Sequence, residues 1–238
     1  MLKTVAQKVN RVATSELMSL PAWTYSNPKF HELELQHLFR PAWHLVCHLS
    51  NIEADGDYFT FEIMNESVVV LPDGKDIRAF HNVCRHRGAR LLDGPSGRIR
   101  EKITCSYHAW IYGMDGSLKK LPDRDQFDNL VPGDHGLAPI ELEIFLGFVF
   151  VRFQKGGDFA IHSNEDHALG TTVAEQFAPA LPDLLPYRFE ELKPLGSVTL
   201  LYRDVNWKQI ADNYVDALHI PVAHPIAHPG LSSLMGNS

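Results

Sequence analysis

The chain has 238 residues, of which 45% are hydrophobic and 21% charged, so it can bury one large core or two modest ones. Its 22 Lys and Arg are outweighed by 29 Asp and Glu, which gives a net charge of −7 with no run of basic residues. This composition excludes a disordered tail and argues against binding to nucleic acid or to an anionic membrane surface.

The longest apolar stretch, residues 144–151, has eight residues, whereas a membrane-spanning helix needs about 20. The first 20 residues mix Lys and Arg with scattered apolar residues and lack the apolar block of a secretory signal, so they are interpreted as an amphipathic helix. The three cysteines are too few for a disulfide framework and suit a reducing compartment. We therefore expect a cytoplasmic protein with no membrane partner.

Short β-rich runs separated by turn residues fill the region between about Trp43 and Phe153. Their spacing indicates a compact antiparallel β domain rather than a parallel α/β sheet. The predicted strands cover residues 44–49, 57–64, 67–71, 77–83, 99–105 and 140–153, with breaks at 53–56, 72–74, 94–97 and 132–136.

The rest of the chain has a different pattern. The elements predicted first are a helix at 165–177 and strands at 189–192 and 197–205. Apolar and acidic residues then recur with helical spacing over 206–218, and Pro221 should end this helix just past His219.

Two Cys-His pairs are the first group of candidate ligands. Cys84 and His86 are separated by one residue, Cys105 and His108 by two, and each pair follows a β-like run. Glycines after each pair permit tight loop turns. Two thiolates and two neutral imidazoles fit a Rieske [2Fe–2S] cluster, but they also fit a tetrahedral structural zinc ion, and the spacing alone leaves both open.

The residues around these pairs, NVCRHRGARL and CSYHAWIYGMDGSL, closely resemble the two cluster loops of Rieske non-haem iron oxygenases. The resemblance implies that Cys84, His86, Cys105 and His108 hold the cluster, with the cysteines on one iron and the histidines on the other, and it favours the cluster over zinc.

Two aromatic residues beside the second Cys-His pair and the third cysteine are not predicted to be ligands. Trp110 and Tyr107 beside the second pair are expected to shield the cluster, although an aromatic residue there could equally be ordinary core. Cys47 has no histidine partner at comparable spacing and is interpreted as a buried small apolar residue.

The second group of candidate ligands lies in the segment NWKQIADNYVDALHIPVAHP, residues 206–225. Asp216 and His219 are three residues apart on the predicted helix and so share a face, while Pro221 turns the chain and lets His224 approach. Two imidazoles converging in this way are two-thirds of a 2-His-1-carboxylate site, which leaves positions open on Fe(II) for dioxygen and substrate.

The order of the two groups resembles the large (α) subunit of Rieske ring-hydroxylating oxygenases and their demethylating relatives, over about residues 30–230. The resemblance implies an α+β chain with an N-terminal helical segment (1–40) and an antiparallel β Rieske [2Fe–2S] domain (41–155). The remaining residues, 156–238, would be the beginning of an incomplete, helix-grip-like catalytic domain.

The same resemblance implies roles for the second group. His219 and His224 would bind a mononuclear iron, and Asp216 would bridge a cluster histidine and an iron-binding histidine across a subunit boundary, usually in a trimer. Asp216 could instead be a solvated helix residue. Asn213 and Asp212 would lie near the iron or be simple polar surface.

The sequence departs from the family pattern at the third iron ligand. No Asp or Glu follows Asp216, so the carboxylate of the facial triad is not evident. We expect a truncated chain; the alternative is that Asp216 or Asp212 is itself the ligand.

A repeated Ala-His-Pro is the second departure. It makes His228 a competitor of His224, and the spacing of four residues after His219 favours His224.

The resemblance implies the terminal oxygenase component of a Rieske system, a mono- or dioxygenase. It would take electrons from a ferredoxin or flavin reductase and use O2 to hydroxylate or oxidatively demethylate an organic, aromatic substrate, as a homotrimer in the full-length form. No Gly-rich dinucleotide loop follows a strand, so nicotinamide would act indirectly. The competing hypotheses are a Rieske electron-transfer module with an inert catalytic stub and a zinc-stabilised binding domain.

Overall fold

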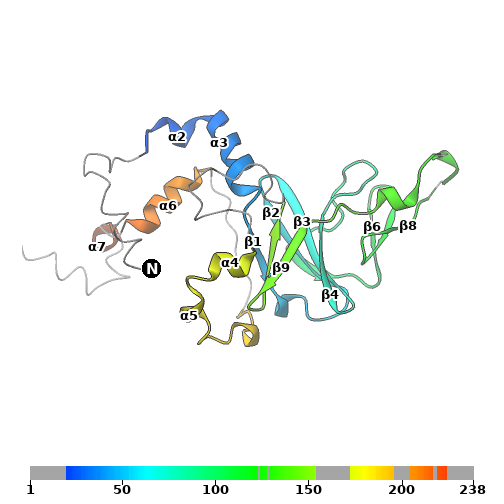
Figure 1. The fold of residues 1–238 in the computed structure, drawn as a ribbon. Coiled ribbons are helices and arrows are strands. Elements are labelled where there is room, and N and C mark those ends of the chain that lie inside the picture. Colours follow the sequence, from blue (N-terminus) through cyan, green and yellow to red (C-terminus); the bar gives the residue numbers. More distant parts are fainter. Residues whose placement is uncertain are drawn as a thin grey trace, which may run out of the picture. The chain divides into compact units, whose positions relative to one another are not determined.

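A computed structural model of the chain describes residues 20–122, 124–127, 129–153, 172–195, 204–216 and 219–223. By packing, the chain divides into two units, one formed by residues 34–198 and the other by residues 1–33 with 199–238. All described strands belong to the first unit (Figure 1).

The strands form three antiparallel sheets. They are β1 (His44–His48), β2 (Asp57–Ile63), β3 (Glu66–Asp73), β4 (Asp76–His81), β5 (Ser96–Arg98), β6 (Lys102–Thr104), β7 (Ile111–Gly113), β8 (Leu118–Lys120), β9 (Glu141–Phe145) and β10 (Phe148–Arg152). The strand orders are β1-β10-β9, β4-β3-β2-β5 and β6-β7-β8. The predicted antiparallel β domain is confirmed.

Strand β3 is the centre of this unit, because residues Val68–Leu71 are completely buried between β2 and β4. Side chains alternate between the two faces of a strand. Val68 and Val70 accordingly pack into one core, which also holds residues of β1 and β10, whereas Val69 and Leu71 pack into a second core. That second core contains the candidate ligands Cys84 and Cys105.

Three strands were not predicted, and one predicted strand is two strands in the structure. β5, β7 and β8 were not predicted, and β5 begins inside the predicted break at 94–97, because three-residue strands are too short to show alternation. The predicted strand at 140–153 is two strands, β9 and β10. They are joined by a tight turn at Leu146 and Gly147, which have φ values of 50° and 80°. The apolar leucine conceals this turn in the sequence.

The helical elements are short. They are α2 (Trp23–Ser26), α3 (Pro28–Glu34), the π-helix η1 (Leu35–Phe39), the 3-10 turns η2 (Leu49–Asn51), η3 (Arg124–Gln126), η4 (Pro132–His135) and η5 (Phe189–Glu191), and helices α4 (Val173–Phe177), α5 (Leu181–Leu184), α6 (Trp207–Val215) and α7 (Ile220–Ala223). No described helix has both the length and the apolarity required to cross a membrane.

Of the elements predicted outside the β domain, one is described only at its end, one is wrong and two lie almost entirely outside the described residues. The helix predicted at 165–177 is described only at its end, where Thr172 and Glu175 form a capping box before α4. The strand predicted at 189–192 is wrong, because η5 occupies it and Arg188 pairs with Glu191 across one turn. The strand at 197–205 and the N-terminal amphipathic helix lie almost entirely outside the described residues.

In the second unit, α6 is held by residues of α2 and α3. The ammonium of Lys208 is buried and lies 5.6 Å from the ring centre of Tyr25 and 5.4 Å from that of Phe30. The Tyr25 hydroxyl donates a hydrogen bond of 2.6 Å to the Asp212 carboxylate, and the Asn206 amide donates to the Tyr25 carbonyl oxygen at 3.1 Å. These contacts join residues about 180 positions apart in the sequence.

Helix α6 ends earlier than predicted. Its last residue is Val215, and Asp216 is extended with φ −85° and ψ 105°. Val and Asp are weak helix formers, which suits the end of a helix at this point. The prediction that Pro221 ends the helix is also wrong: it lies in the first turn of α7, where its missing N–H costs no hydrogen bond.

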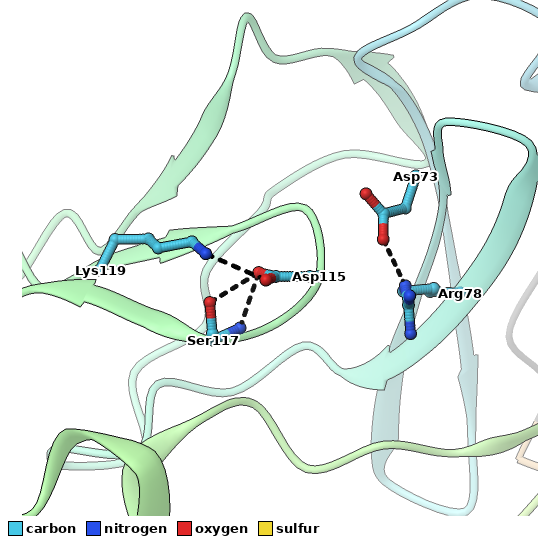
Figure 2. Close-up of polar contacts among 5 residues, drawn as sticks. All are labelled: Asp73, Arg78, Asp115, Ser117 and Lys119. Carbon is cyan, nitrogen blue, oxygen red and sulfur yellow. Dashed lines mark hydrogen bonds and ion pairs between the residues drawn. The ribbon is translucent and has the colours of Figure 1, made fainter.

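The turn between β7 and β8 is fixed by one carboxylate. Asp115 accepts hydrogen bonds from the backbone N–H and hydroxyl of Ser117, at 3.1 and 2.7 Å, and pairs with Lys119 at 3.0 Å (Figure 2). Ser117 and then Lys119 lower the pKa of Asp115 from 3.8 to about 2. Figure 2 also shows Arg78 pairing with Asp73 at 2.6 Å in the β3–β4 hairpin.

Because the pKa of Asp115 is lowered in the folded state, the stability of the folded protein should fall as the pH falls. A carboxyl group whose pKa is lower in the folded state contributes stability above its unfolded pKa, and this is lost as the pH falls through the folded pKa. We expect Asp115→Asn to lower the melting temperature at neutral pH and the difference from wild type to shrink between about pH 4 and about pH 2. Thermal unfolding of both proteins across this pH range measures the difference in melting temperature. Asp134→Asn, at an exposed carboxylate without an ion pair to a described residue, should give a constant difference; parallel curves for both variants would contradict the assignment.

Candidate metal cluster site

The two Cys-His pairs lie in loops that close in the same way. Each cysteine carbonyl oxygen accepts the N–H of the residue four positions later, Gly88 for Cys84 and Ala109 for Cys105, at 3.0 Å in both loops. Each cysteine N–H donates to the carbonyl oxygen five positions later, at 2.8 Å in both loops. Gly88 and Ala109 have positive φ values of 70° and 54°. The two loops are therefore structural repeats, although their histidines sit at different positions.

These loops bring the four predicted donors together. Cys84 and Cys105 are each 2% exposed in the same core, and burial raises the pKa of the Cys84 thiol, with a smaller contribution from neighbouring Cys105. The rings of His86 and His108 are only partly exposed and their centres lie 4.5 Å apart. Two thiols in the core and two imidazoles nearer the surface thus form one site.

Each imidazole has a ring nitrogen without a hydrogen bond to a described residue, which leaves it available as a metal ligand. The Nδ1 atoms of His86 and His108 are buried and make no hydrogen bond to any described residue. A buried polar atom without a partner costs about 1–3 kcal/mol, so such atoms are rare unless they serve a function. Burial, and then the charges of His108 and Arg87, lower the pKa of His86, which favours the neutral form that binds metals. The donor set fits a [2Fe–2S] cluster.

The geometry suits a single zinc ion less well. Among the described residues, no three Cys, His, Asp or Glu side chains come close enough to share one metal ion. Tetrahedral zinc requires four donors within about 2.3 Å of one point, whereas a two-iron cluster places the cysteine pair and the histidine pair on different irons.

Two aromatic rings cover the histidines. Trp110 is 2% exposed and stacks on His86, with ring centres 4.9 Å apart and an interplanar angle of 6°. The ring centre of Tyr107 lies 3.8 Å from that of His108, but Tyr107 is 61% exposed. Trp110 therefore belongs to the core and shields its histidine, and Tyr107 covers the other histidine at the surface.

The sequence analysis missed Tyr112. Its side chain is completely buried, its hydroxyl lies 3.3 Å from the Cys84 sulfur, and it accepts the N–H of Arg85 at 3.0 Å. Burial raises the pKa of Tyr112, so the hydroxyl keeps its proton. Because Tyr112 sits on β7, opposite Ile103 of β6, only the strand pairing could have placed it beside Cys84.

Asn82 was also missed, although it directly precedes the first cluster loop. It is completely buried, and its amide bonds both backbone groups of Leu92, donating at 2.8 Å and accepting at 2.9 Å. It also donates to the Ser67 hydroxyl at 3.2 Å. These bonds close the loop that carries Cys84 and His86 and tie it to β3.

Cys47 lies apart from this site, as predicted. It is 7% exposed in the core shared by β1 and β10, and burial raises the pKa of its thiol to about 12. A thiol this difficult to ionise behaves as an apolar side chain.

The second group of predicted ligands is described only in part. Asp216 and His219 do not share a helix face as predicted, because Asp216 is the extended residue that ends α6, yet their side chains lie 3.4 Å apart. Asn213 is exposed on α6, where Asp212 bonds Tyr25. His224 and His228 lie outside the described residues. The structure therefore brings together one imidazole and one carboxylate of this group.

Comparison with known families identifies the β domain. Residues 42–139 match the family described as the Rieske [2Fe–2S] domain. The predicted Rieske domain and its [2Fe–2S] cofactor are thus confirmed.

Known proteins similar to the chain are oxygenase components. It is 36% identical over 215 residues to the carnitine monooxygenase oxygenase subunit of Escherichia coli (strain K12), covering 88% of this chain and 53% of that protein. It is 33% identical over 210 residues to the chloroplastic choline monooxygenase of Spinacia oleracea, covering 86% of this chain and 44% of that protein. The chain spans about half the length of the curated relatives it matches.

Solved structures that resemble the chain are also those of Rieske oxygenases. The quaternary ammonium Rieske monooxygenase CntA in complex with L-carnitine superposes with a TM-score of 0.71 at 31% identity, covering 90% of this chain and 56% of that one. A naphthalene 1,2-dioxygenase mutant bound to phenanthrene gives a TM-score of 0.67 at 29% identity, covering 89% and 47%. These similarities confirm the resemblance to Rieske oxygenase α subunits and the α+β fold class.

The equivalent positions Gly88 and Ala109 provide a test of the loop geometry. A side chain at positive φ costs about 1–2 kcal/mol, and a Cβ at position 88 would meet nothing closer than 4.0 Å, so backbone strain alone should act. We expect Gly88→Ala to destabilise the protein by about 1–2 kcal/mol and Ala109→Gly to stabilise it by up to about 1 kcal/mol. Denaturant unfolding measures both, with Gly133→Ala, at an open position without positive φ, as the control. Equal effects at all three positions would contradict the shared geometry.

The contact between Tyr112 and Cys84 predicts a change in reduction potential. A hydrogen bond to a cluster sulfur stabilises the more negative, reduced state. We expect Tyr112→Phe to lower the potential of the cluster by roughly 20–60 mV, the equivalent of a hydrogen bond worth about 0.5–1.5 kcal/mol. A potentiometric titration followed by EPR measures the change. The matched control is Tyr58→Phe, which removes a buried hydroxyl bonded to the Asp93 carbonyl oxygen in the same core; a shift of the same size in the control would rule out the direct bond.

Proposed function

We propose that this chain, which belongs to the Rieske oxygenases, is part of the terminal oxygenase component that receives electrons from a ferredoxin or flavin reductase and uses O2 on a small organic substrate. The observation that carries the proposal is the pair of buried Nδ1 atoms of His86 and His108, which make no hydrogen bond to a described residue, in loops that also hold two buried thiols. In this proposal Cys84 and Cys105 bind one iron and the two histidines bind the other.

When bound, the cluster supplies one-electron chemistry between the donor protein and the catalytic iron. The surrounding residues shield the cluster from water, place a hydroxyl beside a ligand sulfur and position the donor atoms. Trp110 excludes water from His86, and Tyr112 places a hydroxyl beside the Cys84 sulfur. Asn82 and the left-handed residues of the two loops hold the donors in place before metal binds. This arrangement limits the structural change that accompanies electron transfer.

The proposed mononuclear iron ligands are His219 and His224, with Asp216 as the bridging carboxylate and Asn213 close to the iron. The 3.4 Å contact of Asp216 with the Nδ1 atom of His219 supports this role. This nitrogen is buried and makes no hydrogen bond to a described residue. A hydrogen bond from it to the carboxylate when metal binds would orient the ring and leave Nε2 for the metal. We further propose that the full-length protein is a homotrimer, in which Asp216 connects a histidine of this site with a cluster histidine of a neighbouring subunit.

For the substrate we propose a quaternary ammonium compound. The sequence analysis expected an aromatic substrate, but the relatives named for carnitine and choline share 36% and 33% identity with the chain, against 29% for the naphthalene dioxygenase structure. One oxygen atom of O2 would hydroxylate an N-methyl group, and two electrons from the donor protein with two protons would reduce the other atom to water. Release of formaldehyde from the hydroxymethyl group would then complete an oxidative demethylation. An aromatic substrate is the second candidate, and the naphthalene dioxygenase fold similarity is what favours it.

Metal and sulfide analysis tests the proposal. We expect the anaerobically purified protein to contain iron and acid-labile sulfide, and its reduced form to give a Rieske EPR spectrum. Cys105→Ala should abolish the acid-labile sulfide and the EPR spectrum, because one iron of the cluster loses a thiolate. Cys47→Ala removes another buried cysteine, which lies outside the site, and should leave both unchanged.

The iron content separates the two electron-transfer hypotheses. About three irons per chain would support a mononuclear site in addition to the cluster, and about two would support a Rieske module that only carries electrons. Colourless protein that holds zinc alone after reconstitution with iron and sulfide would refute the proposal.

A further inference from the structure

Tyr25, a residue of α2, contacts both ends of helix α6. Its carbonyl oxygen accepts a hydrogen bond of 3.1 Å from the side-chain amide of Asn206, the residue that caps the start of α6. Its hydroxyl donates a hydrogen bond of 2.6 Å to the carboxylate of Asp212, in the last turn of the helix. A single residue that is distant in the sequence therefore holds α6 at its beginning and at its end.

The ring of Tyr25 is fixed by a second set of contacts, an aromatic cage around the buried ammonium of Lys208. The Nζ atom of Lys208 lies 5.6, 5.4 and 5.3 Å from the ring centres of Tyr25, Phe30 and Trp207. Cation–π contacts of a desolvated ammonium hold such rings in place. They do not involve the Tyr25 hydroxyl, so Tyr25→Phe should remove the hydrogen bond to Asp212 and leave the cage intact.

Asp212 connects Tyr25 with the proposed iron site. Its backbone carbonyl oxygen accepts the N–H of Asp216 at 3.0 Å, the bond that closes the end of α6. The Asp216 carboxylate lies 3.4 Å from the Nδ1 atom of His219. The residue that Tyr25 holds by its side chain is thus the residue that fixes the backbone of Asp216. A displaced last turn of α6 would move the Asp216 carboxylate relative to His219.

From these contacts we infer that Tyr25 is a positioning residue for the mononuclear iron site. Its hydrogen bond to Asp212 fixes the last turn of α6 and, through this turn, the place of the Asp216 carboxylate beside His219. The inference rests on the proposed function, because it states how a carboxylate of that same site is held. Removing a group that directly supports a ligand typically lowers metal affinity by about 10- to 100-fold. Tyr25 acts through two intervening residues, so its effect should be smaller.

Binding of Fe(II) tests the inference without a substrate or an electron donor. The protein with its cluster assembled is dialysed anaerobically against a series of Fe(II) concentrations. Iron bound in excess of the two atoms of the cluster gives the affinity of the second site. Nitric oxide is then added, because it gives bound high-spin Fe(II) a characteristic EPR signal that reports iron at a defined site. His219→Ala removes a proposed ligand and sets the background of both measurements.

We expect Tyr25→Phe to weaken Fe(II) binding at this site about three- to ten-fold and to leave the EPR spectrum of the reduced cluster unchanged. The bond between Tyr25 and Asp212 is exposed, so its loss should not unfold the chain. The matched control is Tyr214→Phe, which removes the hydroxyl of an 84% exposed tyrosine on α6 itself. The control should bind Fe(II) as tightly as wild type.

Two substitutions of Asp212 separate positioning from direct binding of the iron. In Asp212→Asn the amide oxygen can still accept the Tyr25 hydrogen bond, so the Fe(II) affinity should stay within about two-fold of wild type. Asp212→Ala should weaken binding as much as Tyr25→Phe, and the double variant should weaken it no further. Equal losses in Asp212→Asn and Asp212→Ala would show that the charge of the carboxylate is required, which overturns the inference.

The other outcomes also decide the matter. Equal Fe(II) affinities of Tyr25→Phe and Tyr214→Phe would overturn the positioning role and leave the iron site and the proposed function intact. If wild type binds no more iron than His219→Ala, the proposed mononuclear site fails and the inference fails with it. A loss in Tyr25→Phe that Asp212→Ala reproduces and Asp212→Asn does not would support the inference.

Discussion

The burial of β3 on both of its faces is the constraint on which the larger unit depends. Its alternate side chains enter two cores, and Val69 and Leu71 share one of them with Cys84 and Cys105. The cluster loops are therefore anchored at their cysteines by the same strand that supports the sheet of β1, β10 and β9. A change in the packing of β3 would reach the cysteines directly, because protein cores are close-packed and transmit displacement.

The loops that hold the donors depend on backbone conformation more than on side-chain packing. Both return the chain through a left-handed residue, Gly88 in one loop and Ala109 in the other. Both also use the cysteine's own N–H and carbonyl oxygen for closure, so the main chain of each cysteine is satisfied without water. The side chains are thus free to serve as ligands. The different positions of His86 and His108 in otherwise equivalent loops place their rings at 72° to each other.

The donors of the cluster could be predicted from the sequence because each loop is local: cysteine, histidine and the left-handed residue lie within five consecutive positions. Tyr112 could not, because its contact with Cys84 depends on the pairing of β7 with β6 and on the packing of two separate loops. The three-residue strands were not predicted for a related reason, because three residues are too few to show the alternation of apolar and polar side chains. The end of α6 at Val215 was missed because helical spacing of apolar residues continues beyond the last hydrogen-bonded turn.

The same features that make the site a good ligand set make the metal-free protein less stable. Two buried Nδ1 atoms without hydrogen-bond partners cost about 1–3 kcal/mol each, and the left-handed Ala109 adds about 1–2 kcal/mol. Burial also opposes ionisation of the Cys84 thiol, which metal binding requires. These costs are comparable with the whole stability of a small domain. Binding of the cluster would give the two Nδ1 atoms a role as ligands and would favour the ionised Cys84 thiol. Cluster insertion would therefore stabilise the folded domain.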